Sequence, residues 1–475
     1  MKSSKRDQHL VAACSGRLKD GESSKTDKTN PDVEESAGPS SSSEPLPNEN
    51  ALNDAMLQFA VDVYLELRRG TGGAGSNVLF SPLAVQTMMA LMLALANRRT
   101  ADQLAQALHL HGCQGDDFKL YMRRRAYKLT GLAGGLCYFS FNNKTQLITG
   151  SHVDPCASAG SRLRAAIDSL LVEHQHADFA LDGEGVRERV NEWLHVMSAF
   201  ECEHAIPRGA VNGTTSLLVA SVTSLRTADW KWKFRLRDST SAVFYESSGA
   251  AKRVTMMCQR GRFPTADCDV ELDATALELR YRRYKKSMVL ILPRKRDGLT
   301  ALEMALTAPR LRSCLDRLED RGSVDVKLPK FGVKQAFDLT GVLPRLGVVD
   351  LFVPGLADLP GLPVRNAESS GLAVAKRHLS LAVHCASVQT KEKGHKFGPW
   401  DDPEARLTFN VDHPFMFVVL SRAPEAVLFM GSRLMRHEPP VPRFSYTIIQ
   451  QVAPDLCYDV RYGAHMDSFE VPLEF

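Results

Sequence analysis

Few side chains in this sequence of 475 residues are grouped in a way that could carry out catalysis. The zinc motif HExxH, the nucleophile turn GxSxG and a glycine-rich phosphate loop are all absent. Glu173-His174-Gln175-His176 is a short cluster of side chains that can bind metals, but a polar helix end explains such a run more simply. We therefore predict no metal site, no cofactor and no catalytic residue, and we expect that the protein is not an enzyme.

A polar stretch between two apolar parts of the chain is the strongest indication of function. It runs from Ser387 to Pro403, after a short apolar run and before two runs rich in Val, Phe and Leu. A structureless loop of this length is uncommon in a compact domain and usually has a function, although a tolerated surface insertion is the alternative. The candidate loop residues are Ser387, Gln389, Thr390, Lys391, Lys393, Trp400 and Asp401.

A second candidate site is a group of basic side chains on a short stretch of the chain. Its members are Lys119, Arg123, Arg124, Arg125 and Lys128. Clustered Lys and Arg side chains bind polyanions because binding releases counterions. A solvated basic face of a helix is the alternative, and it is the more common one. The net charge of the whole chain, +4, argues neither for nor against binding to nucleic acid, and we predict no specific nucleic-acid partner.

Apolar patterns on both sides of the polar stretch predict the elements that hold it. Asn53 to Arg68 has apolar residues at helical spacing. Leu83 to Ala96 is apolar almost all round and follows Ser81 and Pro82, which predicts a buried helix with a serine cap. Pro414 to Leu420 and Ala426 to Gly431 read as buried neighbouring strands, because both runs are apolar and turn residues separate them.

The two ends of the chain differ from its middle. Residues 1–50 are rich in Ser, Lys, Glu and Pro and predict a disordered polar tail, whereas 51–437 form the predicted domain. Residues 438–475 are an extension to which we assign no role. No run of 18 apolar residues predicts a membrane span, and the apolar run near the start is too short for a signal peptide. We therefore expect no membrane partner and leave open a cytoplasmic or exported location.

The ten cysteines are scattered along the chain without a close CxxC pair. Zinc binding and redox-active dithiols therefore have little support. We expect most of these cysteines to be small apolar residues of the core.

Several motifs, in order along the chain, resemble the serpin family. The motifs are Asn77–Leu83, Thr100–Leu108, Val190–Leu194, Trp230–Phe234, Val254–Met257, Ala276–Pro293, Val324–Phe331, Asp338–Phe352 and Phe409–Gly431. The resemblance covers residues 53 to about 436, with a poor match from Gly112 to Gly150. It implies an α+β fold with three β-sheets, a helical layer and an exposed reactive-centre loop.

The resemblance also implies a function for the polar stretch. In serpins this loop is bait for a protease, and in inhibitory members the cut loop inserts into the main sheet as a new strand. Inhibitory members carry small uncharged residues in the hinge of the loop, and this chain does not. Aligning from the carboxy-terminal side places the hinge at Ala386-Ser387 and the cut near Trp400-Asp401, whereas aligning from the amino-terminal side places the hinge at Gln389-Thr390.

Under either alignment, insertion of the cut loop into the main sheet would bury charged side chains. Lys391 and Lys393 are the main obstacle to this insertion. An unpaired buried ammonium costs several kcal/mol even after relaxation. We therefore expect weak or no trapping of a protease, and a non-inhibitory or substrate-like protein. The alternative is an active suicide inhibitor of a serine or cysteine protease that acts through the loop 387–405.

Three further expectations come from the resemblance. Some serpins bind heparin through a basic helix near the position of Lys119 to Lys128, which favours a polyanion such as heparin as a partner. Most serpins carry an Asn in the strand that corresponds to Ser216–Val222, and here Ser221 or Val222 takes its place, so sheet opening is expected to differ. The family is extracellular by default.

Overall fold

The structure is a computed structural model, which describes residues 48–70, 76–113, 115–130, 141–153, 162–225, 230–282, 286–363, 377–396 and 407–434. The extension 438–475 and nearly all of the predicted polar tail lie outside the described residues. The first helix, α1 (Glu49–Gly70), begins two residues inside the stretch that we assigned to the tail.

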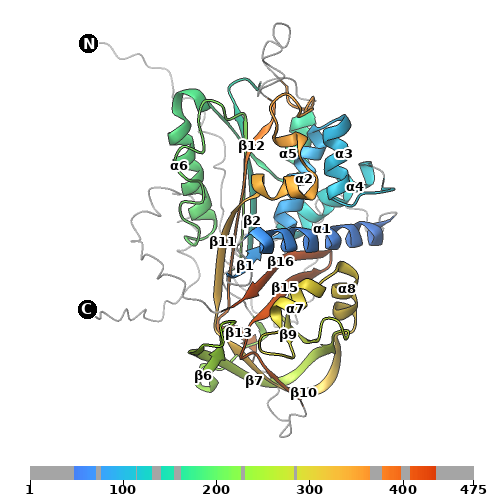
Figure 1. Ribbon diagram of the computed structural model, residues 1–475, viewed down its shortest axis with the longest axis vertical. Helices are drawn as coiled ribbons and strands as arrows, with labels where there is room; N and C mark the ends of the chain where they lie inside the picture. The colour runs from blue at the N-terminus through green and yellow to red at the C-terminus, as the bar shows by residue number, and fades with distance from the viewer. Residues whose placement is uncertain are drawn as a thin grey trace, which may run out of the picture. The chain divides into compact units, whose positions relative to one another are not determined.

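A five-stranded sheet carries the segment that leads into the polar stretch (Figure 1). Its order is β11 (Gly332–Asp338), β12 (Leu379–Gln389), β4 (Leu217–Leu225), β2 (Phe141–Gly150) and β3 (Glu173–Ala177). β12 runs parallel to β4 and antiparallel to β11, and it is paired on both sides over most of its length. The sheet is therefore closed on both sides of β12.

Two expectations from the sequence are wrong in this sheet. Ser387 and Gln389 were assigned to a loop, but β12 continues to Gln389 because its backbone groups pair with β11 on one side and, as far as Val388, with β4 on the other. The polar side chains at the end of β12 show no alternating apolar pattern in the sequence. Strand pairing uses backbone groups and does not require such a pattern. Glu173 to Ala177 is not a helix end either: it forms edge strand β3, parallel to β2.

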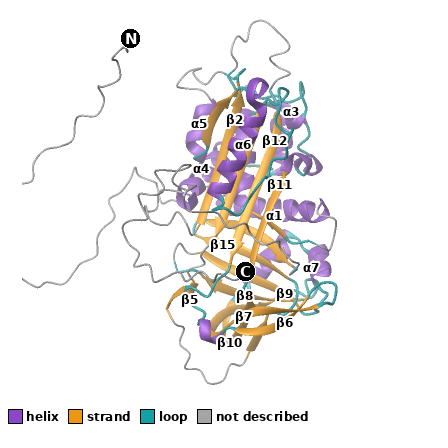
Figure 2. Cartoon of the chain, turned by 90° about the vertical axis from the view of Figure 1, so that its left-hand side faces the viewer, coloured by secondary structure: helices purple, strands orange, loops and turns teal. Residues whose placement is uncertain are grey.

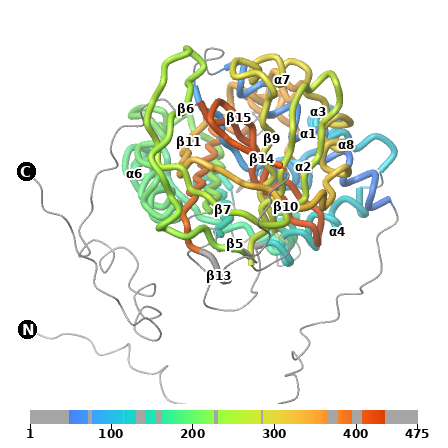
Figure 3. Tube along the Cα trace, turned by 90° about the horizontal axis from the view of Figure 1, so that it is seen from below, coloured from blue at the N-terminus to red at the C-terminus, as the bar shows by residue number. Residues whose placement is uncertain are grey.

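The apolar carboxy-terminal runs lie in a nine-stranded sheet. Its order is β1 (Val78–Phe80), β16 (Glu425–Arg433), β15 (Phe415–Arg422), β9 (Lys286–Pro293), β8 (Ala274–Arg280), β7 (Ala251–Asp267), β10 (Glu319–Pro329) and β14 (Leu407–Asn410), with β6 (Thr240–Tyr245) beside β7. β15 and β16 pair antiparallel, which confirms the two neighbouring buried strands. Figure 3 views the end of the molecule at which β6, β7 and β10 lie.

A third, two-stranded sheet joins β13 (Gly394–Lys396) to β5 (Trp230–Trp232). The described residues thus contain three sheets, together with helices α1, α2 (Pro82–Leu95), α3 (Arg98–Ala107), α4 (Gly115–Arg125), α5 (Arg162–Leu170), α6 (Phe179–Met197), α7 (Leu299–Ala305) and α8 (Ala308–Asp316). Short turns of other helix types cover 126–130, 236–238, 339–341, 343–346 and 350–352. The predicted α+β class is confirmed.

Two helices cover opposite faces of the five-stranded sheet: α6 and α2 lie on either side of it in Figure 1, and α6 lies in front of it in Figure 2. α2 is buried along nearly its whole length, and the Ser81 hydroxyl accepts a hydrogen bond from the Ala84 N–H at 3.3 Å, which confirms the predicted cap. On the other face, Val383 and Cys385 of β12 share a buried cluster with Leu194 of α6. Alternate residues of β12 therefore face opposite helices.

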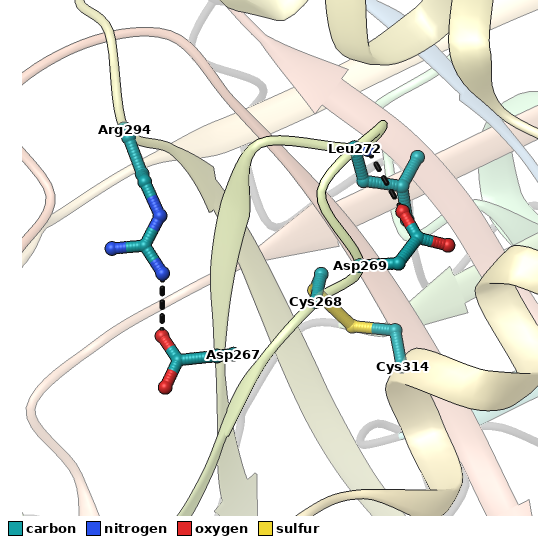
Figure 4. The surroundings of a disulfide bond; sticks show 6 residues. All are labelled: Asp267, Cys268, Asp269, Leu272, Arg294 and Cys314. Atoms are coloured by element: carbon teal, nitrogen blue, oxygen red, sulfur yellow. Dashed lines mark hydrogen bonds and ion pairs between the residues drawn. A yellow bond between two sulfur atoms is a disulfide. The ribbon is translucent and has the colours of Figure 1, made fainter.

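A disulfide joins Cys268, just after β7, to Cys314 in α8, with 4.9 Å between the Cα atoms (Figure 4). The turn that contains Cys268 is held further by the Arg294–Asp267 ion pair and by Asp269, which accepts from the Leu272 N–H at 2.9 Å. These two cysteines are therefore not simple core residues. The pairing could not be deduced from the sequence, because the partners lie 46 positions apart and only the fold brings them together.

Removing this disulfide should destabilise the fold measurably. A cross-link that closes a loop of 46 residues restricts the unfolded chain, and its loss in Cys268→Ala/Cys314→Ala should lower the free energy of unfolding by about 2–4 kcal/mol. Urea denaturation without reductant measures the difference. Cys113→Ala, which removes a half-buried free thiol, is the control. Equal midpoints for the double variant and the parent chain would contradict the prediction.

Candidate functional site

Thr390, the first residue after β12, is held firmly against Phe331, the residue before β11. The Thr390 N–H donates to the Phe331 carbonyl at 2.8 Å. The Thr390 hydroxyl donates to the same carbonyl at 3.0 Å and accepts from the Phe331 N–H at 2.9 Å. Thr390 is buried, so these bonds form away from water. We call residues 390–396 the hinge segment, because they connect the sheet to the predicted loop.

The rest of the hinge segment is attached to β5 through Trp230. The Trp230 indole N–H donates to the Lys391 carbonyl at 2.9 Å, and its backbone N–H donates to the Lys393 carbonyl at 3.4 Å. Trp230 is buried and stacks on Tyr281 with 4.7 Å between ring centroids, so it is a rigid support. β13 then continues parallel to β5.

One ion pair adds to these contacts. The Glu392 carboxylate lies 3.1 Å from the Lys330 ammonium, next to the Phe331 anchor. The Glu392 side chain is largely covered, at 12% exposed, whereas Lys330 is 43% exposed. The side chains of Lys391 and Lys393 are exposed. The hinge segment is therefore attached by its backbone and Glu392, with Lys391 and Lys393 directed to solvent.

The predicted loop residues fall into three groups. Ser387, only 2% exposed, and Gln389, whose amide donates to the Glu201 carboxylate, belong to β12. The two alignments that begin the hinge at Ala386 or at Gln389 do not fit this structure, because those residues are already paired in the sheet. The hinge segment contains Thr390, Lys391 and Lys393, whereas Trp400 and Asp401 lie outside the described residues.

The predicted polyanion site lies on α4 and the turn that follows it. Lys119, Arg123 and Lys128 are exposed. Arg125 faces the interior: it is 3% exposed, its guanidinium lies 4.4 Å from the centre of the Tyr121 ring, and it donates to the Glu425 carbonyl. Including Arg125 in this site is therefore wrong, because helical periodicity turns it away from the other cations.

A buried hydrogen-bond chain that the sequence did not indicate links β12, β4 and α2. The Ser81 N–H donates to Nε2 of His384 at 2.9 Å, so this nitrogen carries no proton. Nδ1 of His384 therefore bears the proton and donates to the Ser221 hydroxyl at 2.9 Å. That hydroxyl donates in turn to the Met88 sulfur at 3.3 Å.

The environment of His384 keeps it neutral. The side chain is fully buried, and this burial lowers the pKa of His384 to about 3. His384 lies opposite Ser221 in the register between β12 and β4, and Ser221 is one of the two residues that the resemblance places at the expected Asn. The network joins the two strands that must separate if a new strand enters between them. A lone His within an apolar run gave no signal for this role.

Other chemistry has little basis in the part of the chain that the structure describes. No group of three or more His, Cys, Asp or Glu side chains is placed there to hold a metal ion. In β3, His174 and His176 both contact the Thr149 hydroxyl, at 3.0 and 3.1 Å. Among the described helices, none combines the length and apolar character needed to span a membrane.

Comparison with known proteins identifies the family. A family model described as Serpin (serine protease inhibitor) matches residues 54–435, and the chain belongs to the serpin family. Iris of Ixodes ricinus is 30% identical over 395 residues, which cover 81% of this chain and 99% of the relative.

Two further comparisons agree. The leukocyte elastase inhibitor of Xenopus tropicalis is 26% identical over 393 residues, which cover 80% of this chain and 98% of the relative. The crystal structure of uncleaved ovalbumin matches with a TM-score of 0.70 and 22% identity, over 81% of this chain and all of that one. The serpin fold expected from the sequence is therefore confirmed, and relatives in the family include proteins named as protease inhibitors.

Proposed function

We propose that this serpin is a substrate-like member of its family. A protease cleaves the chain in the loop after residue 390, and the cleaved chain does not trap the protease. The observation that carries the proposal is that either face of a strand formed by this segment contains a lysine. One face would present Lys391, Lys393, His395, Phe397 and Pro399, and the other Glu392, Gly394, Lys396, Gly398 and Trp400. Side chains of a strand alternate between its faces, so insertion in either register buries a charge.

Two further features of the segment oppose insertion. Pro399 lacks an N–H and cannot complete the hydrogen bonds of a central strand. Insertion that starts at the hinge segment also requires release of the bonds from Trp230 to the carbonyls of Lys391 and Lys393. Each such bond contributes about 1 kcal/mol, so the need to break them slows insertion of the loop. In an inhibitor, insertion must be complete before the protease finishes hydrolysis.

The alternative function is a suicide inhibitor of a serine or cysteine protease, acting through the loop 387–405. Family membership and a relative named leukocyte elastase inhibitor favour it. Incubation with a trypsin-like and a chymotrypsin-like protease separates the two. We expect cleavage within residues 391–406 and no complex that survives SDS. A covalent adduct of protease and chain, stable in SDS, would overturn the proposal in favour of the alternative.

A further inference from the structure

Two free cysteines meet between α6 and the five-stranded sheet. Cys385 lies in β12 and is fully buried, whereas Cys202 lies in the turn after α6 and is 5% exposed. Both belong to the buried cluster that joins α6 to the sheet, and their two thiols share a hydrogen bond. The fold therefore brings into contact two thiols that are distant in the sequence.

The turn that carries Cys202 is held in a fixed position. Ser198 caps the end of α6, and its hydroxyl accepts hydrogen bonds from the N–H groups of Glu201 and Cys202, at 3.2 and 2.9 Å. Between them, Ala199 and Phe200 have φ angles of 60° and 68°, which are costly for residues other than glycine. Such a turn persists only where its surroundings fix it, so Cys202 has little freedom to leave the sheet.

A second contact holds the same turn against β12. The side-chain amide of Gln389, at the end of β12, donates to the Glu201 carboxylate. Gln389 and Cys385 point to the same face of the strand, because an even number of positions separates them. The turn after α6 therefore contacts this face of β12 at two places.

We propose that oxidation joins Cys202 to Cys385 in a disulfide that locks β12 to the end of α6. α6 packs on β4 through the same buried cluster, which contains Leu194 of α6 and Val222 of β4, the residue opposite Cys385 in the register. A covalent link from β12 to the turn after α6 therefore also holds β12 beside β4. This lock lies on the face of the sheet opposite the His384 network, and it does not depend on whether the chain traps a protease.

Hydrogen peroxide is an oxidant small enough to reach this pair. The Cys202 thiolate, which is the less buried of the two, attacks one peroxide oxygen, the O–O bond breaks, and hydroxide leaves, which gives a sulfenic acid. The Cys385 thiolate then attacks the Cys202 sulfur, an S–S bond forms, and the sulfenic oxygen leaves as a second hydroxide. The two thiol protons convert both hydroxides to water, so the cysteines lose two electrons and one peroxide is reduced.

The surroundings of the pair make this reaction slow. The hydrogen bond with Cys202, together with burial, raises the pKa of the Cys385 thiol well above its usual value, so little thiolate is present near neutral pH. The thiols therefore stay reduced until an oxidant is supplied. The chain already contains one disulfide, Cys268–Cys314, and disulfides of this kind persist in oxidising surroundings.

Peptide mapping without reduction tests the link. The full chain is treated with a small molar excess of hydrogen peroxide at mildly alkaline pH, the remaining thiols are alkylated, and the digest is analysed by mass spectrometry. We expect a linked pair of peptides that contains Cys202 and Cys385, and its disappearance after treatment with dithiothreitol. Recovery of both residues as alkylated thiols, or of either one joined to another cysteine, would overturn the proposal.

Hydrogen exchange measures the lock on the sheet. In the peroxide-treated parent chain, the amides of residues 382–388, which pair with β4, should exchange about tenfold more slowly than before treatment. Cys202→Ala cannot form the link, and its exchange should be the same with and without peroxide. Cys113→Ala keeps both partners and should slow as the parent does.

Each chain is compared with its own untreated sample, so destabilisation by a substitution does not enter the comparison. Slowing in the parent and in Cys113→Ala, with none in Cys202→Ala, supports the lock. A linked parent chain whose β12 amides exchange at the unlinked rate would show that the disulfide does not hold the sheet closed. Equal slowing in Cys202→Ala would show that peroxide acts elsewhere in the chain, and it would also contradict the proposal.

Discussion

A variant with small neutral residues in its loop should gain stability on cleavage, whereas the natural chain should not. The variant combines Lys391→Ala, Glu392→Ala, Lys393→Ala, His395→Thr, Lys396→Ala, Phe397→Ala and Pro399→Ala, which removes the obstacles from both faces of an inserted strand. Each buried ammonium that is avoided saves several kcal/mol. After cleavage at Trp400 by a chymotrypsin-like protease, we expect the Tm of the variant to rise by on the order of 10 °C. The cleaved natural chain should stay within about 2 °C of its uncleaved form.

Scanning calorimetry before and after cleavage measures this difference, and mass spectrometry verifies the cut site. The matched control carries Lys119→Ala and Arg123→Ala, which lowers the net charge by two, as the loop substitutions do together, but leaves the loop intact. This control should behave as the natural chain does. A large rise of Tm in the cleaved natural chain would show that its lysines do not prevent insertion, and the proposed function would fail with it.

Replacing His384 with alanine should lower the free energy of unfolding by about 3–5 kcal/mol. The substitution leaves the buried Ser81 N–H without its acceptor and the Ser221 hydroxyl without its donor, and it opens a cavity between β12 and α2. His384→Gln can restore one of the two bonds and should recover part of the loss. Urea denaturation measures these values, and His111→Ala, at an exposed position, is the control. Loss of less than about 1 kcal/mol in His384→Ala would show that the network is not a major constraint.

The same side chain makes stability depend on pH. The pKa of His384 is about 3 in the folded chain because burial disfavours its charged form, and the ordinary value is 6.5. The unfolded chain therefore binds a proton below pH 6.5 that the folded chain does not bind. The contribution of His384 is fully present above pH 6.5 and is lost as the pH falls toward 3.

Between pH 7 and pH 5 this loss amounts to about 2 kcal/mol. Denaturation midpoints of the parent chain and of His384→Ala, measured across this range, isolate the contribution as the difference between their slopes. His111→Ala should keep the slope of the parent. Parallel curves for the parent and His384→Ala would contradict the neutral, buried state of this histidine.

Patterns of apolar residues were reliable where burial alone decides the structure. α2, with its Ser81 cap, and the pair β15 and β16 appear where the sequence predicts them, because continuous burial requires continuous apolar runs. β12 was predicted too short for the opposite reason. Its last residues are polar, and only pairing with β11 and β4 shows that their backbone belongs to a sheet.

By itself, the sequence determined the family, the α+β class and the presence of lysines in the segment that follows β12, because these depend on residue types and their order. The tertiary structure alone decided where the hinge begins, which basic residues face solvent and which distant residues meet. His384 with Ser81 and Ser221, Cys268 with Cys314, and Cys202 with Cys385 are such meetings. Contacts of this kind depend on how strands and helices pack in space, and a linear pattern does not record that packing.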